Sequence, residues 1–171
     1  MPKNHTLQDQ PSELRVVLFQ PDIPGNTGTI LRMAACLGLT VDIIQPAGFR
    51  LDDKSLRRAG MDYLERAAVV QHEDWLAFEE WRLQQQRRLV VLTTKAEQAY
   101  TDFEFRSDDC LLYGRESSGV PDFVHQAADA RLTIPMAQTG RSLNIAISAA
   151  MTCGEAVRQT GQLLASPAGM N

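Results

Sequence analysis

Short apolar runs alternate with segments of helical periodicity along most of the chain. The first run, residues 16–20, precedes two prolines and predicts a buried strand. Residues 27–37 carry apolar side chains three and four positions apart, which predicts a helix with Asn26 as its N-cap and Gly38 at its end. The same patterns predict strands at 41–45, 67–71, 89–93, 110–113 and 131–134, and helices that begin near residues 52, 74, 121 and 142. This alternation predicts an α/β fold with a mostly parallel sheet flanked by helices.

The chain length suits one domain, because 171 residues are enough to bury a core of their own. We expect a polar N-terminal arm at 1–14, the folded domain at 15–161 and a loose tail at 162–171. No apolar run reaches the length of a membrane span, and the polar start lacks the pattern of a signal peptide. We therefore expect a cytoplasmic protein with no membrane partner.

Cysteine and histidine residues show no metal-ligand spacing, so we expect no metal site. The cysteines, Cys36, Cys110 and Cys153, lie among apolar or small residues and are expected to be free thiols of the core.

The charge distribution bears on a nucleic-acid partner. A net charge of −4 argues against a broad RNA-binding surface, since phosphates need a positive field. Two stretches are nevertheless basic: one holds Lys54, Arg57, Arg58 and Arg66, and the other holds Arg82, Arg87 and Arg88. Each stretch is either a local strip for RNA or a solvated helix face, and charge alone favours the solvated face.

Three polar loops follow predicted strands, at 21–26, 114–120 and 135–142. Ligands of parallel α/β folds gather at the carboxyl ends of strands, so these loops are the candidate site. In the first, Gly25, Gly28 and Arg32 would share one stripe of the helix, which suits a phosphate or ribose. A simple turn followed by a surface arginine explains the same pattern and is favoured without further context.

The other two loops also have a functional and a purely structural interpretation. Gly114 and Gly119 bracket a polar loop that either lets backbone amides approach a ligand or makes a tight strand-to-helix connection. Ser142 is explained by capping the last helix. Asn144 lies in the first turn of a helix that is expected to be buried, so its side-chain amide needs hydrogen-bond partners. Together the loops suit binding and orienting two ligands better than hydrolysis.

The last predicted helix is apolar on nearly all sides and rich in small residues. Such a helix must be buried, either inside the fold or against a partner chain, and we infer a homodimer.

In this order and spacing, the three loop segments resemble the three motifs of the SPOUT methyltransferases, in the SpoU/TrmH-like branch. Asn26 and Arg32 are similar to the first motif, 114–119 with Glu116 to the second, and 134–144 to the third. The resemblance covers nearly all of residues 15–160. In addition, residues 48–63 resemble a segment of the small tRNA 2′-O-methyltransferases that act on a wobble cytidine or uridine.

This resemblance implies methyl transfer from S-adenosyl-L-methionine to the ribose 2′-OH of the wobble nucleotide of tRNA. It also implies a deep C-terminal trefoil knot and a homodimer in which each chain completes the other's site. The residues it implies for cofactor binding are Leu92, Thr93, Gly114, Ile134, Met136 and Ser142. Those it implies for catalysis are Arg32, Asn26, Glu116, Ser142 and Asn144, and those expected to bind tRNA are Lys54, Arg57 and Arg58.

Three alternatives remain open at this point. The enzyme could methylate another tRNA position or ribosomal RNA, although relatives that do so carry extra domains. A non-catalytic RNA-binding module could keep the same fold, but the combined motif residues argue against it. An unrelated nucleotide-binding protein such as a dehydrogenase would need G-x-G-x-x-G after the first strand, and residues 24–28 do not match it.

Overall fold

A parallel sheet forms the centre of the computed structural model, which describes residues 13–51, 54, 67–138 and 140–162. The strand order is β3-β2-β1-β5-β4-β6, and every neighbouring pair is parallel. The strands are β1 (Arg15–Phe19), β2 (Thr40–Ile44), β3 (Val69–His72), β4 (Arg88–Leu92), β5 (Asp109–Tyr113) and β6 (Ala130–Leu132). The predicted α/β class and parallel sheet are therefore confirmed.

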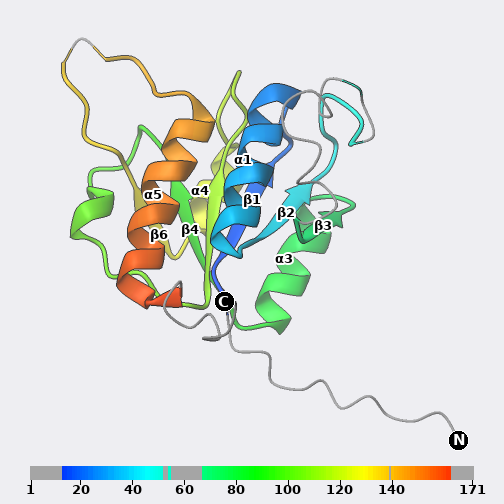
Figure 1. The fold of residues 1–171 in the computed structure, drawn as a ribbon, viewed down its shortest axis with the longest axis horizontal. Coiled ribbons are helices and arrows are strands. Elements are labelled where there is room, and N and C mark those ends of the chain that lie inside the picture. Colours follow the sequence, from blue (N-terminus) through cyan, green and yellow to red (C-terminus); the bar gives the residue numbers. More distant parts are fainter. Residues whose placement is uncertain (1–12, 52–53, 55–66, 139, 163–171) are drawn as a thin grey trace, which may run out of the picture.

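Helices cover both faces of this sheet (Figure 1). They are α1 (Pro24–Leu37), α3 (Trp75–Gln84), α4 (Asp122–Ala127) and α5 (Ile145–Thr160), with a 3-10 turn, η2, at Tyr100–Asp102. The first core contains Val16 and Leu18 of β1 and lies under α1 and α5, which pack side by side. The second core contains Val17 together with Phe78 of α3 and Val124 of α4. Successive residues of β1 thus face opposite cores, which explains why the strand appears in the sequence as a continuous apolar run.

Two predicted helix caps are wrong. α1 begins at Pro24 with Ile23 as its N-cap, so Asn26 lies inside the first turn. Proline suits this first position because its φ already matches a helix and its missing N–H would have no partner there. α5 is capped by Asn144, whose Oδ1 accepts a backbone N–H at 2.8 Å, rather than by Ser142. Both asparagines consequently stand in or next to a first helical turn.

Other local predictions are confirmed, with one exception. Asp74 caps α3, and its Oδ1 accepts the N–H of Ala77 at 2.8 Å. Gly38 ends α1 with a φ of 67°, a conformation that glycine adopts without strain. Cys110 and Cys153 are buried thiols, whereas Cys36 is exposed on α1, so its predicted place in the core is wrong.

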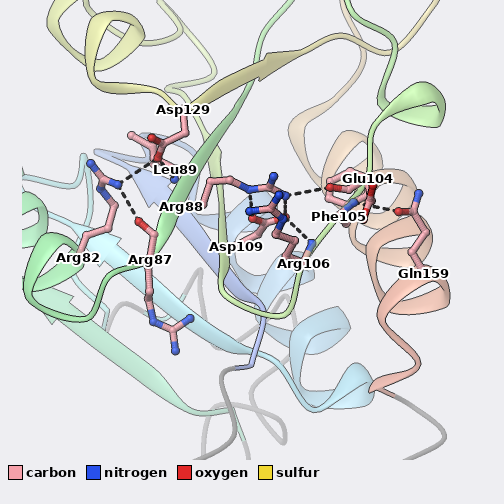
Figure 2. A network of polar contacts seen from close by, with 10 residues as sticks. All are labelled: Arg82, Arg87, Arg88, Leu89, Glu104, Phe105, Arg106, Asp109, Asp129 and Gln159. Carbon is pink, nitrogen blue, oxygen red and sulfur yellow. Dashed lines mark hydrogen bonds and ion pairs between the residues drawn. The ribbon is translucent and has the colours of Figure 1, made fainter.

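The second basic stretch belongs to a polar network at the amino edge of the sheet (Figure 2). Arg82 is only 4% exposed, pairs with Asp129 at 3.2 Å and donates to the carbonyl oxygen of Arg87 at 2.7 Å. Arg88 binds the two carboxylate oxygens of the fully buried Asp109 at 2.6 and 2.8 Å. The prediction of a solvated face is therefore wrong for Arg82 and Arg88, because their guanidinium groups serve the fold itself.

We expect Asp109→Ala to destabilise the protein strongly, because Arg88 and the N–H of Arg106 would lose their buried acceptor. Breaking a buried ion pair from one side costs about 3–5 kcal/mol, and the free energy of unfolding should fall by that order in urea titrations. Arg158→Ala, which removes an exposed pair with Glu155, is the control and should leave the midpoint unchanged. Equal midpoints for both variants would contradict the role assigned to this network.

Candidate active site

A cavity of about 490 Å³ opens at the carboxyl edge of the sheet. Its walls come from the segments that follow β1, β4, β5 and β6. Parallel strands end at the same edge, so segments far apart in the sequence meet there. Three of these segments are the predicted loops, and the fourth follows β4 at residues 92–95. The volume lies within the range of small-molecule sites, about 300–1,000 Å³.

Most of the predicted site residues meet at this cavity. Those that line it are Asn26, Leu92, Thr93, Gly114, Glu116, Ile134, Met136, Ser142 and Asn144. Arg32 is not among the lining residues; it is exposed on α1, about 9 Å along the helix axis from Asn26. Lys54 is exposed and does not line the cavity, while Arg57 and Arg58 lie outside the described residues.

The loop after β5 closes on itself beside the cavity. Arg115 and Gly119 exchange two backbone hydrogen bonds, of 2.9 and 2.8 Å. Gly119 has a φ of +68°, and a Cβ placed on Gly114 would lie 2.5 Å from the carbonyl carbon of Gly119. The two glycines are therefore required by the turn, and the turn also forms part of the cavity wall. The interpretation as a tight strand-to-helix connection is therefore confirmed, and the approach of backbone amides to a ligand stays a prediction.

A chain of amide hydrogen bonds links the first two predicted loops to Asn144, the cap of α5 that follows the third loop. Asn144 donates from Nδ2 to Oδ1 of Asn26 at 2.9 Å, and Asn26 donates from Nδ2 to Oε1 of Glu116 at 3.5 Å. The other oxygen of Glu116, Oε2, accepts the backbone N–H of Asp22 at 3.1 Å. The need of Asn144 for partners, predicted from its position, is thus met by another site residue and by the start of its own helix.

Two acidic residues, Glu116 and Asp22, are in contact at the end of this chain. Burial, followed by the hydrogen bond with Asp22, raises the pKa of Glu116 above its ordinary value. Hydrogen bonds with Glu116 and then Ser117 lower the pKa of Asp22. The pair therefore divides its charge unequally, with Glu116 as the member that holds a proton more readily.

The site residues predicted from the sequence do not include Asp22, Lys95, Tyr113 or His125, which also belong to this region. Lys95, Tyr113 and His125 line the cavity. The hydroxyl of Tyr113 lies 2.5 Å from Oγ1 of Thr152 on α5, and burial raises its pKa well above the ordinary value. Lys95 and Tyr113 come at or just after strand ends, a signal that could have identified them; His125 on α4 carries no comparable signal.

Within the described ranges, no three His, Cys, Asp or Glu side chains are grouped so as to hold a metal ion. In the same part of the chain, no helix has the length and apolar character needed to cross a membrane.

The chain matches a known family over most of its length. Residues 13–154 match the SpoU rRNA Methylase family. The protein belongs to this family. The match includes Asn26, Glu116 and Asn144, and so covers the whole hydrogen-bonded chain at the cavity.

Relatives and solved structures within the SpoU family are close in both sequence and fold. The tRNA (cytidine(34)-2′-O)-methyltransferase of Beijerinckia indica is 57% identical over 148 residues, which are 86% of this chain and 92% of the relative. A structure described as giving insights into 2-OH methylation of C/U34 on tRNA is 38% identical. Its TM-score is 0.82, with 88% of this chain and 97% of that chain covered.

A third relative in the SpoU family was solved with its cofactor. The methyltransferase AviRb of Streptomyces viridochromogenes, in complex with AdoMet, is 28% identical with a TM-score of 0.81. The match covers 86% of this chain and 60% of AviRb. The fold of this SpoU protein is therefore one that binds S-adenosylmethionine in a solved relative.

We expect Gly114→Ala to abolish cofactor binding, because the new methyl group would collide with backbone atoms of Gly119 and displace the cavity wall. Isothermal titration with S-adenosylmethionine measures the effect, with circular dichroism to check folding. Gly25→Ala is the matched control, since a Cβ there meets nothing within 4 Å and Gly25 does not line the cavity. Normal affinity in Gly114→Ala would show that this loop is not part of the cofactor site.

Proposed function

We propose that this protein transfers a methyl group from S-adenosyl-L-methionine to the ribose 2′-OH of the wobble nucleotide of tRNA, a cytidine or modified uridine. The observation that carries the proposal is the Asn144–Asn26–Glu116 chain at a cavity, in a protein 57% identical to a tRNA (cytidine(34)-2′-O)-methyltransferase. The similar structure concerned with C/U34 supports the same substrate. A tRNA substrate also supports the cytoplasm as the place of action.

The cavity suits this cofactor in size and in chemistry. Its wall combines apolar side chains, hydroxyl groups and the bare backbone at Gly114, which can approach a ligand closely. When bound, S-adenosylmethionine would supply an electrophilic methyl group on a sulfonium centre. The residues that would hold it are Leu92, Thr93, Gly114, Ile134, Met136 and Ser142. We further propose that a deep trefoil knot at the C-terminal end of the domain forms this cradle, as the SPOUT resemblance implies.

The protein's own task is to place the ribose hydroxyl in line and to favour loss of its proton. Asn26, Asn144 and Ser142 line the cavity, where their amide and hydroxyl groups would orient the ribose. Glu116 anchors the Asn26 amide, which in turn binds Asn144. Arg32 binds the adjacent phosphate and stabilises the developing alkoxide, because a guanidinium stays protonated and is a poor base. The basic residues that would hold the tRNA phosphates are Lys54, Arg57 and Arg58.

A homodimer would bring Arg32 to a site. Arg32 does not line the cavity of its own chain, and α5 exposes Ile147 and Met151, 53% and 39%, on its outer face. These apolar side chains lie one turn apart and form a stripe suited to a second copy of the chain. We propose that α1 and α5 pair across a dimer and that Arg32 of one protomer completes the partner's site.

The decisive experiment is a methyl-transfer assay with purified protein, labelled S-adenosylmethionine and total tRNA from a strain that lacks the gene. Nuclease digestion and mass spectrometry then map the product. A 2′-O-methyl group on the wobble nucleotide is the expected result. Label at another tRNA position or in ribosomal RNA would overturn the substrate, and no label in any RNA would overturn the proposed activity.

Arg32→Lys should lower the single-turnover rate by at least about 100-fold, because lysine cannot reproduce the planar fork on a phosphate and a developing alkoxide. Affinity for S-adenosylmethionine should stay unchanged, since Arg32 does not line the cavity. Arg106→Lys, at an exposed arginine of the opposite edge, is the matched control and should keep the wild-type rate. A near-normal rate in Arg32→Lys would remove this residue from the mechanism.

Ile147→Glu should convert the dimer to a monomer, as measured by light scattering after gel filtration, and should abolish methyl transfer. Leu76→Glu, at an even more exposed position on α3, is the control for adding a charge to an apolar surface site.

Mixed dimers of Arg32→Lys and Asn144→Ala chains test the shared site. One of their two sites regains activity if Arg32 acts on the partner, and neither does if it acts within its own chain.

A further inference from the structure

Asp22 contacts the loop after β5 through both its backbone and its side chain. Its N–H donates to Oε2 of Glu116 at 3.1 Å, and its Oδ2 accepts a hydrogen bond from the Ser117 hydroxyl. The Nε of Arg115 lies 3.6 Å from the same oxygen. Asp22 therefore faces three consecutive residues of the loop that carries Glu116, although it is more than 90 positions away in the sequence.

The hydrogen bonds of the amide chain at the cavity all run the same way from donor to acceptor, and the last acceptor is Glu116. Oδ1 of Asn144 accepts the N–H of Ala146, and its Nδ2 group donates to Asn26. Asn26 accepts there with Oδ1 and can only donate onward with Nδ2, to Glu116. If Glu116 turned away, the last donor would lose its acceptor and both amides could rotate.

The position of Glu116 depends in turn on Asp22. Two neighbouring carboxylates repel each other unless one of them binds a proton. Burial and Asp22 raise the pKa of Glu116, while Glu116 and Ser117 lower that of Asp22. Oδ1 of Asp22 is buried and accepts no hydrogen bond from the described residues, so this carboxyl group keeps an unused acceptor beside the loop. A proton bound to the pair would also halve the negative charge beside a cavity proposed to take RNA.

We propose that Asp22 is a positioning residue of the transferase site, which holds Glu116 in place and through it orients the Asn26 and Asn144 amides. Asp22 does not line the cavity, so it reaches the amides through the loop residues that it contacts, of which Glu116 is the one bound to Asn26. This inference rests on the proposed methyl transfer, because the amides matter only if they place a ribose.

The test compares Asp22→Asn with Asp22→Glu, and with Asp102→Asn as a control at an exposed acid outside the site. A small misplacement of reacting groups costs up to about 100-fold in rate, so Asp22→Asn should lower the single-turnover rate by about tenfold or more. Affinity for S-adenosylmethionine should stay unchanged. Asp22→Glu, which keeps the carboxylate, should recover most of the rate, and Asp102→Asn should match the wild type.

A double-mutant cycle separates positioning from a general structural role. In a Glu116→Gln background, Asp22→Asn should cause no further loss, because Asp22 affects the amides through the position of the Glu116 carboxylate, which this background has already removed. Independent, multiplying losses would overturn the inference, as would a wild-type rate in Asp22→Asn.

A carboxyl titration by NMR on the protein without RNA makes the test independent of the substrate. Asp22→Asn removes a negative neighbour, so the pKa of Glu116 should fall; Arg115 beside the pair and Lys95 and His125 at the cavity stay in place. An unchanged titration would overturn the inference for any substrate. If the wild-type protein methylated no RNA, the proposed function would fail, and this titration alone would decide whether Asp22 controls Glu116.

Discussion

The six strands of the described sheet all run in the same direction, and the site depends on that constraint. β1 lies between β2 and β5. Because Leu18 pairs with Tyr113, β1 and β5 end next to each other at the same edge of the sheet. The loops that follow, 21–26 and 114–120, therefore start side by side, and Asp22 reaches Glu116. An antiparallel β5 would carry its loop to the opposite edge of the sheet. Parallel pairing thus brings the cavity, the amide chain and the carboxyl pair to one place.

The two edges of the sheet use polar groups in opposite ways. At the amino edge, guanidinium and carboxylate groups saturate one another, as in the two-pronged contact between Arg88 and Asp109. At the carboxyl edge, Asn144 donates a hydrogen bond to Asn26, and Asn26 donates one to Glu116. Both asparagines still line an open cavity. Charges that pair with each other stabilise a fold, whereas anchored neutral amides remain available to a ligand.

The two helix starts show how the fold prepares these amides. Pro24 moves the start of α1 three residues ahead of the expected position, which places Asn26 in the first turn instead of at the cap. Asn144 caps α5 with its oxygen and keeps its NH₂ group for Asn26. The proline signal was present in the sequence. The capping preference of asparagine favoured a later helix start than the proline did, because no local pattern shows that the side chain of Asn26 has a distant partner.

The sequence by itself determined the α/β class, the strands and the three loops, because periodicity and turn residues depend only on near neighbours. The order of its motifs was also enough to indicate the SpoU family. Only the tertiary structure decided which groups meet: the backbone N–H of Asp22 with Glu116, and Arg88 with Asp109. It also decided that Arg32 lies outside the lining of its own cavity. Contacts between residues far apart in the sequence follow from strand order and register, which no local pattern encodes.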